Sequence, residues 1–268
     1  MSFRMYFLKI CYLFKISRNT KTLVRLFGNS IKFHIHYKLN LYSKEDQSAK
    51  FYELSIQERS IDLFMRTNKG DLAIFYEIFW KEIYKIPFLV LPEKSVILDL
   101  GAHIGCTAIY FSMIYPDAQI YAVEASEESY NILKENVKSF KNIIAVQAVI
   151  DSKDGVVCFD TSGYSFNSKI NHNGKMVQSI SISTLMMQYQ ITRVNLIKID
   201  IEGAEKNILQ NNVNWLKKTD NMIIELHDDY KLVDLSKDIA PFGFTLTIPS
   251  KTNGLLNIFA GRTLENQH

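Results

Sequence analysis

From residue 93 onward the chain alternates between short apolar runs and longer stretches in which apolar residues recur every three or four positions. The short runs are typical of buried strands, and the longer stretches have the period of amphipathic helices. Strands are predicted at 95–100, 119–124, 143–149, 194–200, 221–227, 243–248 and 255–260. Helices are predicted at 104–115, 126–139, 203–215 and 230–239. This alternation predicts a doubly wound α/β fold: a seven-stranded, mostly parallel, Rossmann-like sheet with helices on both faces and an antiparallel hairpin at its end.

The first 92 residues follow other patterns and are predicted to form an N-terminal extension to a main domain at 93–268. Residues 3–14 place six apolar side chains on one helical face: Phe3, Tyr6, Phe7, Ile10, Leu13 and Phe14. Strict alternation over 31–39 predicts a half-buried strand, and a second strand region covers 51–66. After a turn at 68–70, a helix is predicted from Asp71, as its cap, to about Tyr84.

Basic residues interleave with the apolar stripe of the N-terminal helix, at Arg4, Lys9 and Lys15. A basic amphipathic helix can lie on an anionic membrane surface, so peripheral membrane contact through residues 1–16 is one interpretation. The other is that the stripe packs on the body of the protein or against another subunit. Both interpretations stay open, as does the oligomeric state.

Charge is unevenly placed along the chain. Residues 1–50 carry ten Lys or Arg and two acidic residues, a net charge of +8. The remaining residues carry 21 Lys or Arg and 26 acidic residues, a net charge of −5. A mildly acidic body argues against a nucleic-acid partner. No apolar run reaches the roughly 18 residues of a membrane span. Lys9 interrupts the apolar start and no cleavage site follows, so this segment is predicted to be retained.

The cysteines and histidines exclude a structural zinc site. Cys11, Cys106 and Cys158 have no CxxC spacing, and the six histidines form no HExxH pair. Free thiols indicate a reducing cytoplasm, so we expect a cytoplasmic enzyme, with membrane association left open.

The first strand of the main domain ends in VILDLGAHIG, where Asp99 stands near the strand tip and Gly101 and Gly105 bracket a turn. Such a turn lets the backbone approach a ligand and directs a helix N-terminus toward it. The GxxxG spacing lacks the GxGxxG fingerprint of a dinucleotide pyrophosphate. It suits S-adenosylmethionine (SAM), which has no phosphates.

The next two strands offer contacts for an adenosine. Glu124 ends the second strand, where its carboxylate can accept hydrogen bonds from both ribose hydroxyls. The third strand ends at residues 148–151, where backbone and apolar groups can hold adenine and Asp151 either touches the adenine edge or starts a turn. The predicted donor-binding residues are therefore Asp99, Gly101, Ala102, Gly105, Glu124, Ala125, Ala148 and Asp151.

The fourth and fifth strands bring acidic residues to the same edge. The run LIKIDIEGAE places Asp200 at a strand tip, and MIIELHDD ends in Glu225 and His227 on one strand face. We predict these three as catalytic residues, with His227 as general base or with Asp200 and Glu225 holding a divalent ion such as Mg²⁺. Glu202 and Glu205 follow where a helix begins. They either join this acidic group or supply favourable charge at the helix N-terminus.

These motifs together resemble the FkbM-type methyltransferases, a branch of the class I SAM-dependent enzymes. The resemblance rests on VILDLGAHIG, YAVEAS, LIKIDIEGAE and IIELH, and it covers about residues 94–262. It implies SAM as cofactor, with Asp99, Gly101, Gly105 and Glu124 at the donor and Asp200, Glu202 and Glu225 at the acceptor. It also implies O-methylation of a hydroxyl on a sugar, glycan or related metabolite. The chain has SISTLMM where the family often has a Leu-Asp-Asp-Leu-like stretch.

Two other functions remain open at this point. A nicotinamide-dependent oxidoreductase would share the sheet and Glu124, although GxGxxG is absent. A non-catalytic membrane-surface adaptor would explain the basic N-terminus but not the acidic residues at strand tips.

Residues 151–193 form an insertion with a hairpin after Asp154, and we expect it to act as a substrate lid.

Overall fold

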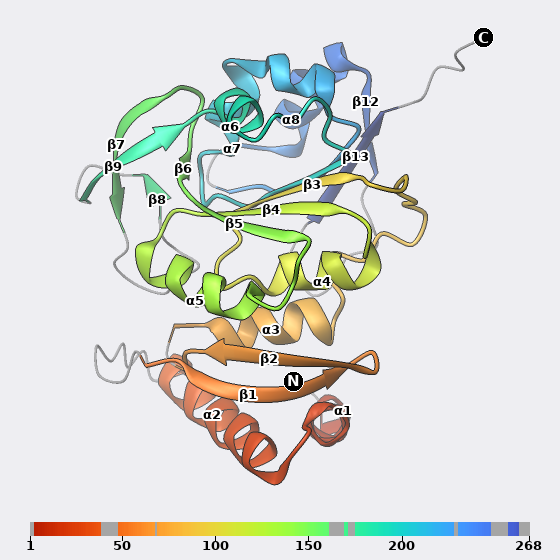
Figure 1. The fold of residues 1–268 in the computed structure, drawn as a ribbon, viewed down its shortest axis with the longest axis vertical. Helices are drawn as coiled ribbons and strands as arrows, with labels where there is room; N and C mark the ends of the chain where they lie inside the picture. Colours follow the sequence, from red (N-terminus) through yellow and green to blue (C-terminus); the bar gives the residue numbers. More distant parts are fainter. Residues whose placement is uncertain are drawn as a thin grey trace.

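The computed structural model describes residues 3–38, 48–67, 69–160, 169–170, 175–227, 230–247 and 257–262 (Figure 1). Its centre is a seven-stranded sheet with the strand order β12-β13-β11-β10-β3-β4-β5. The strands are β3 (Val96–Leu100), β4 (Gln119–Glu124), β5 (Ile143–Gln147), β10 (Leu196–Ile199), β11 (Asn221–Glu225), β12 (Phe244–Thr247) and β13 (Asn257–Arg262). β13 pairs antiparallel with both β11 and β12, and the other pairs are parallel. The predicted doubly wound fold is confirmed.

Helices cover both faces of this sheet (Figure 1). One face carries α4 (Cys106–Ile114) and α5 (Glu127–Val137), and the other carries α6 (Ile182–Gln188), α7 (Glu205–Gln210) and α8 (Leu232–Ile239). Short 3₁₀ turns, η2 (Val213–Lys218) and η3 (Ala240–Phe242), complete the second layer. Because the central strands β3, β4 and β10 are buried on both sides, their sequences read as nearly continuous apolar runs.

The N-terminal part adds three more layers below α4 and α5 (Figure 1). These are α3 (Asp71–Phe79), the antiparallel hairpin of β1 (Lys50–Ile56) and β2 (Arg59–Met65), and the pair α1 (Phe3–Ile16) and α2 (Thr20–Lys38). One hydrophobic core joins them to the sheet, since residues such as Leu26, Leu54, Phe75 and Tyr110 belong to a single cluster. The described residues of the N-terminal part therefore share one core with the main sheet.

The predicted strand at 31–39 is wrong, because residues up to Lys38 continue helix α2. Alternating apolar residues there are not buried: Ile31 and Ile35 are exposed. The face that packs inward carries small polar residues, since Asn29 donates a hydrogen bond to the Tyr52 hydroxyl at 2.7 Å and the Ser30 and Tyr76 hydroxyls lie 2.7 Å apart. Because the buried face carries polar residues, the apolar residues of this segment do not show the helical period.

The predicted helix at 71–84 ends earlier, with α3 closing at Phe79. Asp71 does not cap it through its side chain, because the N-cap residue is Gly70, whose φ of 91° only glycine adopts readily. The carboxylate of Asp71 is instead engaged by Arg66, whose backbone N–H donates to it at 2.7 Å. The prediction of Asp71 as a cap is therefore corrected.

The 151–193 insertion and the two residues before it form a smaller, four-stranded sheet beside β5, with the strand order β6-β9-β7-β8. Its strands are β6 (Val149–Ile150), β7 (Gly155–Asp160), β8 (Lys169–Ile170) and β9 (Lys175–Ile180), and α6 follows. Two parts of the expected lid, 161–168 and 171–174, and the turn of the expected C-terminal hairpin, 248–256, lie outside the described residues. None of the described helices is both long and apolar enough to cross a membrane.

Candidate functional site

The glycine turn after β3 is built around a backbone that leaves no room for a side chain. Gly101 has a φ of +79°, and a Cβ at this position would lie 1.8 Å from the carbonyl oxygen of Asp200. The N–H groups of Gly101 and Ala102 donate to the carbonyl of Val123 at 3.0 and 2.9 Å. These contacts hold the turn against the ends of β4 and β10, at the carboxyl edge of the sheet, where open α/β sheets bind ligands.

Glu124 at the end of β4 is held by backbone donors. One carboxylate oxygen accepts from the N–H of His103 at 2.8 Å, and the other accepts from the N–H of Ser126 at 2.8 Å. Each oxygen keeps a further lone pair, so the carboxylate can also accept from ribose hydroxyls. His103 reaches this position with a φ of 52°, in the left-handed region.

A cavity of about 470 Å³ opens beside this carboxylate. One end is lined by Gly101, Ala102, Glu124, Ala125, Ala148, Val149 and Ile150, and the other end by Tyr84, Asp200, Glu202 and Glu225. The N-terminal part supplies the facing wall, through Phe33, Ala73, Ile74, Glu77, Ile78 and Ile83. The extension predicted from sequence is thus part of the site.

Asp99 lies beneath the cavity and does not line it. Its carboxylate is fully buried, 3.5 Å from the ammonium group of Lys198, which also donates to the Gly101 carbonyl at 2.9 Å. Burial raises the pKa of Asp99, and Lys198 opposes that shift. Lys198 lies 3.1 Å from Asp200 as well. The buried lysine therefore ties the glycine turn to the acidic residues at the tip of β10.

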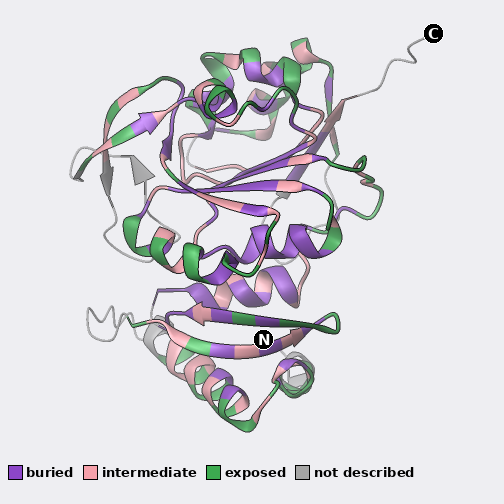
Figure 2. Ribbon diagram, in the orientation of Figure 1, coloured by how far each residue is buried: buried purple, intermediate pink, exposed green. Residues whose placement is uncertain are grey.

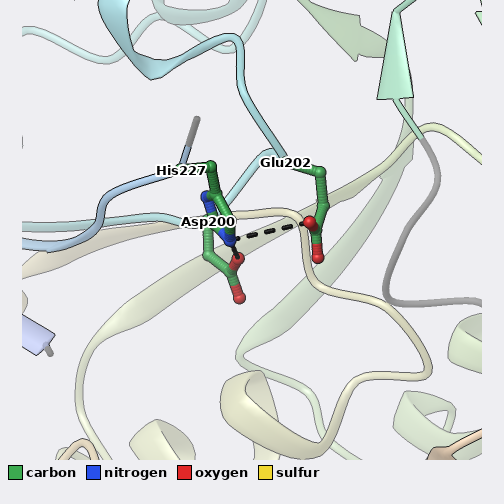
Figure 3. A group of neighbouring side chains, drawn as sticks. All are labelled: Asp200, Glu202 and His227. Carbon is green, nitrogen blue, oxygen red and sulfur yellow. Dashed lines mark ion pairs between the residues drawn. The ribbon is translucent and has the colours of Figure 1, made fainter. Parts of the chain in front are cut away.

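The acidic end of the cavity gathers around His227 (Figure 3). Its Nε2 lies 3.8 Å from Asp200, 3.6 Å from Glu202 and 3.9 Å from Glu225. Its Nδ1 lies 2.9 Å from Glu205, which is fully buried and also accepts the N–H groups at 201 and 203. Glu205 thus orients the imidazole, so its role goes beyond charge at a helix N-terminus.

The pKa values at this end are shifted by crowding of like charge. Burial, then the charge of Asp200, raises the pKa of Glu202 to about 8 and that of Glu225 to about 7. Burial lowers the pKa of His227, but Glu205 and the other carboxylates outweigh it and bring it to about 9. At neutral pH His227 is therefore an imidazolium, and Glu225 exchanges its proton readily.

One grouping among the described residues can place three ligand atoms around a metal ion: Asp200, Glu202 and His227, whose atoms lie within 4.8 Å of one another. Glu225, predicted as a metal ligand with Asp200, is not in that group. A metal would have to displace the proton of His227, because only neutral imidazole binds a metal.

Most of the residues predicted to form the site lie together. Gly101, Ala102, Glu124, Ala125, Ala148, Asp200, Glu202 and Glu225 line the cavity. Asp99, Gly105, Asp151 and His227 do not line it. Asp151 accepts from the N–H of Ser152 at 2.7 Å and from the side chain of Asn207, so it stabilises the turn that follows β6.

Sequence reasoning missed three residues that organise the site: Lys198, Tyr84 and His103. Tyr84 is buried and its hydroxyl donates to Asp200 at 3.5 Å. The sequence indicates a role for Lys198, because a lysine inside the apolar run LIKI must find a partner when buried. It does not indicate the roles of Tyr84 and His103, because these depend on contacts between distant segments.

The sheet order, the glycine turn and the acidic residue at the end of β4 define a class I SAM-dependent methyltransferase fold. The family model described as "Methyltransferase FkbM domain" matches residues 99–241. The chain belongs to the FkbM methyltransferase family.

Individual relatives are distant. The chain is 27% identical to Hexuronic acid methyltransferase AglP of Haloferax volcanii over 149 residues, which cover 54% of this chain and 61% of that protein. It is 27% identical to Methyltransferase 1 of Beauveria bassiana over 186 residues, 58% of this chain and 73% of that protein. Among solved structures, the fibrillarin pre-rRNA processing protein of Methanococcus jannaschii aligns with a TM-score of 0.47 and 14% identity, covering 82% of this chain and 83% of that one.

Proposed function

We propose that this chain transfers a methyl group from SAM to a hydroxyl oxygen of a sugar or glycan. The observation that carries the proposal is one cavity with two different ends. The glycine turn and Glu124 form one end, and poised carboxylates form the other. The relative named a hexuronic acid methyltransferase supports a sugar as the acceptor.

The donor end fits the adenosine and amino-acid parts of SAM, which supplies an electrophilic methyl group on a sulfonium when bound. Glu124 would accept hydrogen bonds from the ribose, because its carboxylate faces the cavity with lone pairs to spare. Ala148, Val149 and Ile150 would cover the adenine, since they form an apolar wall next to Glu124. Glycine at 101 lets the turn approach the backbone of Asp200, which a side chain would block, and so brings the two ends of the cavity together.

At the other end, Glu225 is proposed to take the proton of the acceptor hydroxyl. It lines the cavity, and a pKa of about 7 balances the ability to accept a proton against the need to be ionised. His227 does not line the cavity, and its positive charge lowers the pKa of Glu225. In this scheme Asp200 and Tyr84 orient the hydroxyl, and His227 is a positioning residue where the sequence suggested a base.

Replacing Glu124 with glutamine is expected to weaken binding of S-adenosylhomocysteine (SAH) by about 10- to 100-fold. A hydrogen bond to a charged group contributes roughly 1.5–3 kcal/mol. The amide would also present a donor to the N–H of His103 or Ser126, which now donates to the carboxylate. Calorimetric titration of the purified chain with SAH measures the change.

The matched control for this test is Glu127→Gln, three residues away in the first turn of α5 and exposed. It should leave SAH affinity unchanged. Binding of NAD or NADP in place of SAH would contradict the proposal and revive the oxidoreductase interpretation. Equal SAH affinity of wild type and Glu124→Gln would remove Glu124 from the donor site.

Chelation is expected to leave methyl transfer unchanged. The imidazolium of His227 already supplies positive charge between Asp200 and Glu202, where an ion would lie. Rates measured in EDTA and in added Mg²⁺ should therefore agree. A rise with Mg²⁺ that disappears in Asp200→Asn would show that a metal replaces the proton of His227.

A further inference from the structure

The two N-terminal helices each expose an apolar stripe on the side away from the protein. On α1 the stripe consists of Phe7, Ile10 and Phe14, and on α2 of Val24, Phe27, Ile31 and Ile35. Spacings of three and four residues put the members of each stripe on one helical face. Phe14 is 66% exposed and Val24 is 64% exposed. Exposed apolar residues that are grouped in this way mark an interaction surface, whereas single ones are common.

The opposite faces of both helices are buried against the hairpin. Leu13 and Ile16 of α1 and Leu26 of α2 lie in the same core as Tyr52 and Leu54 of β1. Both exposed stripes therefore point away from the hairpin, at the end of the molecule remote from α6 and α8 (Figures 1 and 2). The inner face of the first helix therefore packs on the protein, as one of the two sequence interpretations has it, and its outer face is exposed.

The charge of this region identifies the kind of partner. Residues 1–38 contain eight Lys or Arg and no Asp or Glu. Lys21, Arg25 and Lys32 recur along one border of the α2 stripe. A second copy of the chain would bring the same positive charge face to face, which is repulsive. Nucleic acid would leave the apolar stripes uncovered. A surface with anionic groups above hydrocarbon matches both features.

We propose that α1 and α2 dock the protein on an anionic membrane surface, with the two apolar stripes entering the headgroup region and exposed basic residues such as Lys15 and Lys21 contacting lipid phosphates. Phe33 on α2 lines the cavity, while its neighbours Ile31 and Ile35 belong to the exposed stripe. The same helix therefore separates the membrane face from the cavity. This arrangement suits an acceptor that is itself attached to a lipid.

The experiment measures co-sedimentation of the full chain with vesicles of phosphatidylcholine, alone or with about one quarter phosphatidylserine. We expect binding to the anionic vesicles, at least tenfold weaker binding to neutral ones, and weakening by salt. Phe27→Gln with Ile31→Gln should reduce binding about tenfold or more, because both side chains leave water on docking. Lys15→Gln with Lys21→Gln should reduce it about 25-fold, roughly fivefold for each lysine.

Matched controls lie at the other end of the molecule. Met187→Gln with Val233→Gln removes two exposed apolar residues, and Lys217→Gln with Lys237→Gln removes two exposed charges. Both should bind vesicles like wild type. Failure of wild type to bind anionic vesicles, or equal loss in variants and controls, would overturn the proposal. So would a change from dimer to monomer in Phe27→Gln with Ile31→Gln, since a second copy would then cover the face. An unchanged melting temperature of each variant checks its fold, so the result is independent of the proposed methyl transfer.

Discussion

Replacing Glu225 with glutamine is expected to slow methyl transfer by about 10²- to 10⁴-fold, the usual contribution of a general base. Glu225 ends β11 and lines the cavity, so it can reach an acceptor hydroxyl. Glutamine has nearly the same shape and cannot take a proton at neutral pH. SAH binding should stay close to the wild-type value, because the donor end of the cavity is unchanged.

The pH dependence follows from the shifted pKa of Glu225. A base works only when it has lost its proton, so kcat/KM should rise with pH and reach half its maximum near pH 7. In His227→Gln a neighbouring positive charge is lost, so the pKa of Glu225 rises further. The rise in kcat/KM should then move to higher pH, with a smaller loss of maximal rate than in Glu225→Gln.

The assay uses SAM and an acceptor found by screening sugar hydroxyls. Glu77→Gln is a suitable control, since Glu77 also lines the cavity but is paired with Lys81 at 3.2 Å. Glu77→Gln should lower kcat/KM by less than tenfold. A half-maximum near pH 8 that disappears in Glu202→Gln would assign the base to Glu202. Loss of the whole pH dependence in His227→Gln would restore His227 as the base and contradict the assignment to Glu225.

The sheet and its carboxyl edge could be predicted because their signals are local. A strand buried on both faces must be apolar along its length, so the run at 119–124 matches β4 residue for residue. Glycine at 101 and acidic residues at strand tips also show in the sequence, because a close backbone approach and a polar ligand require these residue types.

The N-terminal part could be predicted only in outline. The pattern at 31–39 predicts a strand where α2 continues to Lys38, because polar contacts of Asn29 and Ser30 replace apolar burial on the inner face of the helix. The cavity wall formed by Phe33 and α3 was equally hidden, since it depends on how the extension packs. His103 matters because its main-chain N–H holds Glu124, a role that any residue type could fill.

Replacing Asp71 with asparagine is expected to destabilise the protein by about 3–5 kcal/mol, the usual consequence of breaking a buried ion pair. Arg66 and Asp71 are both fully buried, and the guanidinium binds both carboxylate oxygens at 3.0 Å. Asparagine would leave the arginine with only the half-exposed Glu128 as a charged partner, at 3.0 Å. For a chain of this size the melting temperature should fall by roughly 6–20 °C.

The pH dependence of this loss distinguishes the ion pair from simple packing. Burial alone would raise the pKa of Asp71, but His103 and Arg66 outweigh it and hold the pKa well below its usual range. The carboxylate therefore stabilises the fold at every pH above its unfolded pKa of about 4, and this contribution declines as the pH falls below that value. The difference in unfolding free energy between wild type and Asp71→Asn should shrink accordingly in acid.

Asp62→Asn is the matched control for urea unfolding at each pH. Asp62 lies on the same hairpin and pairs with Arg18 at 3.1 Å, but both side chains are exposed to solvent. Loss of this exposed ion pair should lower the free energy of unfolding by less than about 1 kcal/mol. His103 lies 3.2 Å from Asp71 and its N–H holds Glu124, so Asp71→Asn should also weaken SAH binding, which Asp62→Asn should not. Equal stability and equal SAH affinity of the two variants would show that the buried pair neither supports the fold nor positions the donor site.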